Sequence, residues 1–170
     1  PATVPVAQED RIIDKLSKRP QTNVCVDGID NLAIHFAKCC SPVPGEPIVG
    51  FITRGRGLAV HNMNCPRIRN LEPERHVECH WDPRIADGAA TRSVNLSVLA
   101  TDRIGILQDV IKVMAEMKIN ISQTHCRTLA DSMQCMLTFE VQVVDIKQLN
   151  MLIKNIQKTP GVVSVERCTT

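Results

Sequence analysis

The sequence predicts an α+β protein in which a small β-rich cysteine module precedes a ferredoxin-like βαββαβ domain. Short stretches of alternating apolar residues, separated by turn residues, fill 22–70. Strand and helix periodicities then follow one another in the order βαββαβ over 92–168. We therefore divide the 170 residues into the end of a preceding helical region (1–21), the cysteine module (22–83), a linker (84–91) and the βαββαβ domain (92–170).

The first part of the chain predicts one amphipathic helix and several short strands. Apolar residues share one helical face within 8–19, and Pro20 ends that helix. Alternation then predicts strands at 24–26, 32–36, 48–53 and 58–61, the last two joined by a glycine-bearing hairpin turn. Pro66 begins a short helix, with Asn64 as its expected cap. A unit of about 50 residues with few large apolar side chains is near the limit for folding without a staple.

The second part predicts two helices on one face of a four-stranded antiparallel sheet. Strands are expected at 93–100, 119–129, 133–143 and 162–167. Helices are expected from apolar stripes at 106–117 and 146–156, the first capped by Asp102 and the second ended by Pro160-Gly161. Right-handed crossovers place both helices on the same face of the sheet.

Charge is distributed unevenly, although the net charge is only +2. No acidic residue lies between Glu46 and Glu72, whereas this stretch contains four arginines, at positions 54, 56, 67 and 69. An unopposed basic stretch predicts a phosphate-facing surface, although a solvated arginine cluster has the same pattern. Aromatic residues make up 2% of the chain and Tyr is absent, which argues against a base-stacking platform. No run of 18 apolar residues predicts a membrane span.

Three thiols and one imidazole form a candidate tetrahedral metal site, for which the expected ligands are Cys39, Cys40, His61 and Cys65. Adjacent side chains on an extended strand point in opposite directions, so both neighbouring cysteines reach one ion only if a turn begins at Ser41. The alternative is a reduced thiol cluster packed under the hairpin. A competing ligand set, or simply exposed strand residues, is formed by His76, Cys79 and His80.

The sequence offers no enzyme motif. It has no His-Asp pair, no Gly-x4-Gly-Lys phosphate loop and no Gly-x-Ser-x-Gly elbow. The turn before the first helix of the βαββαβ domain is a candidate ligand site, made of Asp102, Arg103, Gly105 and Ile106. N–H groups at a helix start suit a carboxylate, and Asn120 is expected to line the side-chain pocket with Ile106. Alternatively, Asp102 only caps the helix and Gly105 only relieves close packing.

Both halves resemble one protein family. AKCCSPVPGEPIVGFITRGRGLAVHNMNCPRI, with its Cys-Cys-x-Pro-x-Pro-Gly, Gly-Arg-Gly and His-x3-Cys elements, closely resembles the conserved-cysteine module of the long RelA/SpoT homologues. These are bifunctional (p)ppGpp synthetase/hydrolases, and the module is also called the zinc-finger or ribosome-intersubunit (RIS) domain. SVLATDRIGILQDVIKVMAEMKINISQTHCR resembles an ACT domain. Together the resemblance covers about 22–168.

The resemblance implies a non-catalytic regulatory region in the cytoplasm, belonging to a GTP pyrophosphokinase or (p)ppGpp hydrolase of the stringent response. It assigns a zinc or thiol set to the four Cys and His residues, and ribosome contacts to Arg54, Arg56, Asn62, Asn64 and Arg67. The implied partners are large-subunit ribosomal RNA, A-site tRNA and the enzyme's own upstream catalytic domains, with no membrane. The alternative is an amino-acid sensor, in which a dimerising ACT domain binds a branched-chain amino acid at the 102–106 turn. A third interpretation is a purely structural clamp.

Overall fold

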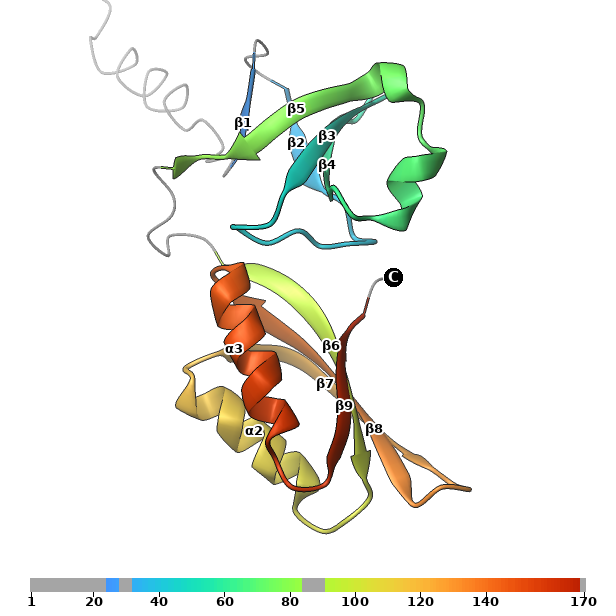
Figure 1. Cartoon of the computed structure of the whole chain (residues 1–170), viewed down its shortest axis with the longest axis vertical. Coiled ribbons are helices and arrows are strands. Elements are labelled where there is room, and N and C mark those ends of the chain that lie inside the picture. Colours follow the sequence, from blue (N-terminus) through green and yellow to red (C-terminus); the bar gives the residue numbers. More distant parts are fainter. Residues whose placement is uncertain (1–23, 28–31, 84–90, 169–170) are drawn as a thin grey trace, which may run out of the picture.

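The computed structural model describes residues 24–27, 32–83 and 91–168 and contains two β-sheets in sequence (Figure 1). A β-rich module with a five-stranded sheet precedes a βαββαβ domain, which confirms the predicted α+β class. The helix expected within 8–19 and most of the expected linker, 84–90, lie outside the described residues.

The sheet of the cysteine module has the strand order β1-β5-β3-β4-β2. Its strands are β1 (Val24–Val26), β2 (Ile34–Phe36), β3 (Ile48–Thr53), β4 (Gly57–Asn62) and β5 (His76–Trp81). The predicted hairpin is present, since β3 and β4 pair antiparallel from Ile48 opposite Asn62 to Thr53 opposite Gly57. Strand β2 pairs parallel to β4.

Two short 3₁₀ helices connect β4 to β5, namely η2 (Pro66–Asn70) and η3 (Pro73–Arg75). The helix expected after Pro66 is therefore present, but Asn64 does not cap it. The residue before η2 is Cys65, which makes no side-chain cap, and the Asn64 N–H is instead bonded to the Asn62 side chain. Apolar packing in this module centres on Leu58 and Val60, which are fully buried.

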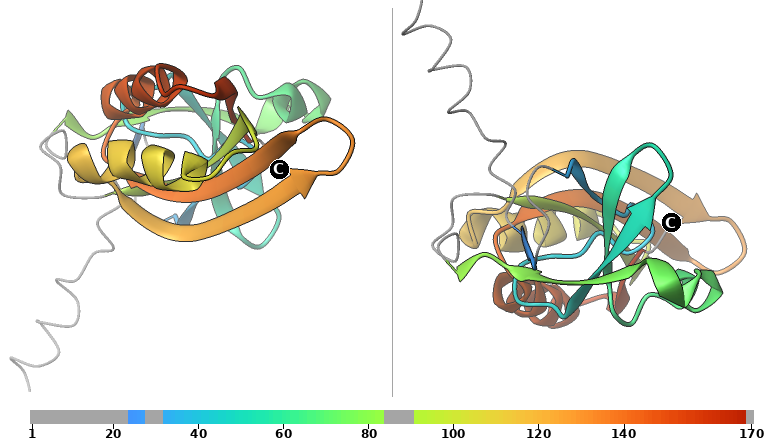
Figure 2. Two further views of the ribbon diagram at one scale, coloured as in Figure 1. Left: turned by 90° about the horizontal axis from the view of Figure 1, so that it is seen from below. Right: turned by 90° about the horizontal axis from the view of Figure 1, so that it is seen from above.

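The second sheet has the order β7-β8-β6-β9 and is antiparallel throughout. Its elements are β6 (Arg92–Thr101), α2 (Ile106–Glu116), β7 (Asn120–Leu129), β8 (Gln134–Val143), α3 (Ile146–Gln157) and β9 (Val162–Arg167). Figures 1 and 2 show α2 and α3 on the same face of this sheet, as predicted. Alternate residues of β6 and β8 point towards the helices and are buried, among them Leu96 and Phe139.

The expected cap of the first helix of the βαββαβ domain is wrong. Gly105, with a φ of +85°, precedes α2, and no side chain caps its N–H groups. The Asp102 N–H donates to the carbonyl of Met133 at 2.9 Å, so Asp102 is tied to the β7–β8 turn rather than to the helix. No helix in the described part of the chain is long and apolar enough to cross a membrane.

Candidate metal centre and nucleic-acid interface

A tight turn brings Cys39 and Cys40 to the same place. The Ser41 N–H donates to the Ala37 carbonyl at 2.8 Å, and Ser41 has a φ of +39°. Residues 38–40 are therefore coiled rather than extended, and neighbouring side chains no longer point in opposite directions. This is the condition under which both cysteines can bind one ion.

Strand β4 and the turn after it supply the other two ligands. His61 lies near the end of β4 and is 9% exposed, and the Cys65 N–H donates to the Asn62 carbonyl at 2.9 Å. The Asn62 backbone N–H donates to the Cys40 sulfur at 3.3 Å, and its side-chain oxygen accepts the Asn64 N–H at 2.8 Å. Asn62 therefore shapes the turn that carries Cys65.

The four ligand atoms converge as predicted, because they all lie within 4.8 Å of one another. The Cys39 Sγ is 3.6 Å from the Cys65 Sγ and 4.0 Å from the Cys40 Sγ. The His61 Nδ1 is 3.5 Å from the Cys39 Sγ and 3.8 Å from the Cys40 Sγ. Zinc at ordinary bond lengths in a tetrahedron requires S···S of about 3.8 Å and S···N of about 3.6 Å. The spacing and chemistry of these donors therefore fit a zinc ion.

Burial favours the neutral forms of these ligands. It raises the pKa of Cys40 to about 12, and burial together with the neighbouring Cys65 raises the pKa of Cys39. Burial, His35 and Arg67 lower the pKa of His61, which keeps its imidazole neutral. A neutral imidazole is ready to bind a metal, whereas the thiols must first lose protons that a divalent cation would displace.

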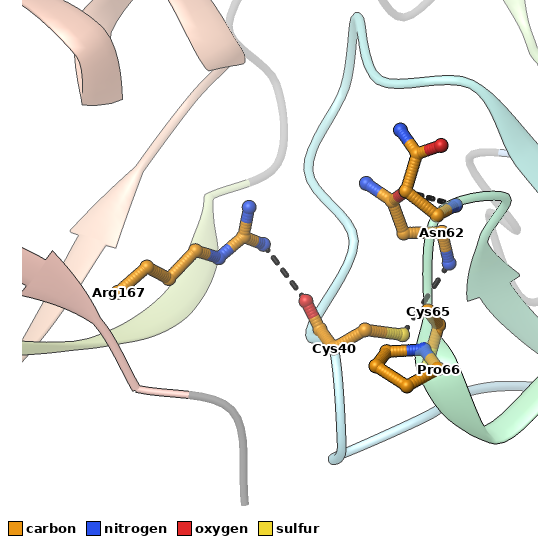
Figure 3. Close-up of a pocket in the computed structure, with 6 residues that line it drawn as sticks. Cys40, Asn62, Cys65, Pro66 and Arg167 are labelled. Atoms are coloured by element: carbon orange, nitrogen blue, oxygen red, sulfur yellow. Dashed lines mark hydrogen bonds between the residues drawn. The ribbon is translucent and has the colours of Figure 1, made fainter.

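A pocket of about 170 Å³ lies beside the cysteines and is lined partly by the ACT-like half of the chain (Figure 3). Arg167, from β9, donates to the Cys40 carbonyl at 2.9 Å and forms an ion pair with Glu46 at 2.6 Å. Sequence reasoning missed both residues. Arg167 is 127 residues from Cys40, and no local pattern links the two.

Arg54 and Arg56 lie at the exposed tip of the β3–β4 hairpin, on either side of Gly55. The stalk below them is fixed by packing: a Cβ on Gly57 would lie 2.1 Å from the Ala33 carbonyl oxygen, and Gly57 has a φ of +84°. Neither arginine forms an ion pair with any residue in the described ranges. Two guanidinium groups are therefore presented to solvent on a rigid support.

The other predicted RNA contacts lie at the opposite end of β4, beside the cysteines. Asn64 and Arg67 are exposed there, while Asn62 is half-buried and holds the turn. His76 and His80 are exposed on β5 and Cys79 is buried, and these three residues form no ligand cluster among the described residues.

The predicted amino-acid site is divided by the fold. Arg103 donates to Asp109 at 2.6 Å and to the Pro160 carbonyl at 2.8 Å, so it closes over the start of α2. Asn120 pairs with Gln142, at the end of the sheet where β6 begins, whereas the 102–106 turn follows the end of β6. Within one chain, therefore, Asn120 does not line a pocket with Ile106, because α2 separates the two positions by its full length.

Family models match both parts of the chain. Residues 24–82 match the RelA/SpoT RIS domain and residues 89–167 match the ACT domain. A solved ACT domain from the GTP pyrophosphokinase of Chlorobium tepidum aligns with 46% of this chain and all of its own, at 19% identity and a TM-score of 0.42. The two parts are accordingly a RIS domain followed by an ACT domain.

Curated relatives extend this match across both domains. A GTP pyrophosphokinase of Myxococcus xanthus is 44% identical over 86% of this chain and 19% of its own length. That of Escherichia coli K12 is 32% identical over 85% of this chain and 19% of its own. The chain belongs to the RelA/SpoT family, of which it carries the RIS and ACT domains, and it spans about a fifth of the length of these relatives.

Proposed function

We propose that this chain is the regulatory region of a GTP pyrophosphokinase or (p)ppGpp hydrolase, and that it reports the state of the ribosome by contacting ribosomal RNA. The observation that carries the proposal is the arginine-tipped hairpin. Arg54 and Arg56 are exposed, have no acidic partner among the described residues and stand on a packed stalk. Guanidinium groups bind phosphate oxygens bidentately, and a rigid support reduces the entropy lost on binding.

The contacts themselves carry no base specificity. The described part of the RIS domain has no exposed aromatic ring at the hairpin tip, so recognition rests on phosphate charge and RNA shape. Asn64 and Arg67, at the other end of β4, extend the same surface towards a second stretch of RNA backbone, or towards the A-site tRNA. Binding there transmits ribosome state to the upstream catalytic domains.

The test is ribosome binding measured across a salt series. Arg54→Ala with Arg56→Ala should weaken binding and reduce the slope of log affinity against log salt by somewhat less than about one unit per lost contact. Lys112→Ala with Lys147→Ala, which removes the same charge from exposed positions on the ACT helices, should change neither. Equal slopes for wild type and the double arginine variant would refute the interface.

We also propose that the four-ligand cluster holds zinc. The tetrahedral spacing of the three sulfurs and the His61 nitrogen supports this proposal. The ion would serve as a structural staple joining the turn at 38–41 to the end of β4. Metal analysis of protein purified without chelators is the test, and one zinc per chain is the expected result. Protein that is folded, reduced and metal-free under these conditions would support the thiol-cluster alternative.

The amino-acid sensor is the second candidate function, favoured by the ACT match and by the exposed turn before α2. A bound carboxylate would have to draw Arg103 away from Asp109 and Pro160. Since β7 is an outer strand with exposed side chains, a second copy of the chain can dock along it and bring another Asn120 close. Calorimetry with valine, isoleucine and leucine decides this question: heat of binding lost in Arg103→Ala supports the sensor, and no heat excludes it.

A further inference from the structure

One segment of the RIS domain is built into the ACT domain. Residues 40–46, which we call the strap, begin at a candidate metal ligand and run between the two sheets, as the blue loop above α3 in Figure 1. Val43, in the middle of the strap, is fully buried and belongs to the apolar core of the ACT domain. The strap is therefore not a loose connection.

Backbone contacts fix the position of the strap on the ACT domain. The Ile146 N–H, at the start of α3, donates to the Pro44 carbonyl at 2.9 Å. The next residue must be glycine, because Gly45 has a φ of +93° and a Cβ there would lie 2.7 Å from the Ile146 Cγ2. The strap thus supplies an acceptor for an N–H group at the start of α3 that the helix itself leaves without a partner.

Arg167 links this docked strap to the thiol cluster. Its guanidinium donates to the carbonyls of both Cys40 and Ser41 and pairs with Glu46, whose other oxygen accepts the Val43 N–H at 2.8 Å. The Arg167 and Glu46 side chains are only 19% and 10% exposed. Ser41 has left-handed backbone geometry, which is unfavourable for a residue other than glycine and needs such support.

We propose that Arg167 is a positioning residue for the metal centre, so that the ACT domain completes the zinc site of the RIS domain. By holding the Cys40 and Ser41 carbonyls, Arg167 fixes the turn that directs the Cys39 and Cys40 sulfurs to one point. This inference rests on the proposed binding of zinc but not on ribosome binding. Coupling between two sites is reciprocal, so zinc binding must in turn favour the docked strap.

The experiment measures zinc affinity of the whole 170-residue chain by competition with a colorimetric chelator. Arg167→Ala should weaken zinc binding about 10- to 100-fold, the range typical of residues that orient metal ligands. Arg167→Lys should give an intermediate loss, because an ammonium group cannot reproduce the fork that spans two carbonyls and a carboxylate. Arg127→Ala, an exposed arginine on β7 of the same domain, is the matched control and should leave zinc affinity unchanged.

A second readout distinguishes coupling from simple loss of folding. Addition of zinc to wild-type protein should slow hydrogen exchange of the Ile146 amide, which bonds to the strap, and Arg167→Lys should reduce this effect. Glu46→Gln provides the same test from the RIS side if Arg167→Ala does not fold. Equal zinc affinity in wild type, Arg167→Lys and Glu46→Gln would overturn the coupling and leave the zinc proposal intact. Absence of zinc binding by wild type would overturn both.

Discussion

The sheet of the ACT domain packs against two helices of 11 and 12 residues, whereas the longest described helix in the RIS domain is the five-residue η2. The ACT core accordingly buries side chains from both sheet and helices, among them Phe139, Leu96 and Met114. The buried core of the RIS sheet is limited to Val24, Ile48, Leu58, Val60 and Cys79 among the described residues, with the cysteines forming a separate cluster. The difference indicates that apolar burial stabilises the ACT domain, whereas the RIS domain needs its thiol cluster and its docking partner.

This comparison explains why two kinds of staple meet in residues 39–46. Cys39 and Cys40 tie one end of the segment to β4 and Cys65, and Val43 ties its middle to the ACT core. A small sheet with few buried apolar residues gains stability from each of these links. The variants below separate the two kinds of stabilisation, in order of decreasing expected effect.

Loss of a direct ligand should have the largest effect. Cys65→Ser should lower zinc affinity by more than about 100-fold, beyond the loss typical of supporting residues, and should unfold the RIS domain while the ACT helices persist. Zinc competition and the fluorescence of Trp81, the single tryptophan of the chain, report these two changes. Cys126→Ser is the control, because Cys126 is exposed on β7 and far from the cluster in the fold. Equal effects of the two substitutions would contradict the metal-centre assignment.

A large cavity in the ACT core should have the opposite distribution of effects. Phe139→Ala should destabilise the ACT domain by about 3–5 kcal/mol, because a fully buried aromatic side chain is lost. In urea unfolding, helical circular dichroism reports the ACT domain and Trp81 fluorescence reports the RIS domain. We expect the helical transition to shift further than the Trp81 transition. Identical shifts would mean that the two domains unfold as a single unit.

Two glycines of the arginine hairpin provide a matched pair within the RIS domain. Gly55→Ala should cost about 1–2 kcal/mol for its left-handed geometry alone, since a Cβ there meets nothing within 4 Å. Gly57→Ala should cost more, because its Cβ would collide with the Ala33 carbonyl as well. Trp81-detected unfolding in urea measures both. A smaller cost for Gly57→Ala would show that the hairpin stalk is not packed against Ala33.

Strands, helices and the convergence of the four ligands could be predicted from local patterns. Alternation over 48–53 and 58–61 and the intervening glycines specify a hairpin, and a hairpin brings His61 back alongside Cys39. The start of α2 could not be predicted, because the Asp102 N–H is held by the Met133 carbonyl, a contact set by the β7–β8 hairpin. The roles of Arg167 and Glu46 depend on domain docking across 121 residues of sequence, for which no periodicity exists.

The smallest expected effect is a pH dependence of the RIS core. Burial raises the pKa of Cys79 from 9.0 to about 11, so the unfolded chain releases this proton at lower pH than the folded chain. The contribution of the neutral thiol is therefore complete below pH 9 and declines as pH rises from about 9 to about 11. Cys79→Ala should remove this part of the decline, as measured by Trp81-detected unfolding at several pH values. A parallel pH profile in wild type and Cys79→Ala would show that this thiol does not titrate on unfolding.

Site-resolved hydrogen exchange of the whole chain, with zinc and after its removal by a chelator, tests the central comparison most directly. The account predicts that chelation strips protection from the β3–β4 amides of residues 48–62, while the amides of β6 and β8 remain protected. Protection of the Ile146 amide should fall together with that of β3–β4, because the strap joins it to the cluster. Unchanged protection in β3–β4 after complete removal of zinc would contradict the claim that the thiol cluster stabilises the RIS domain.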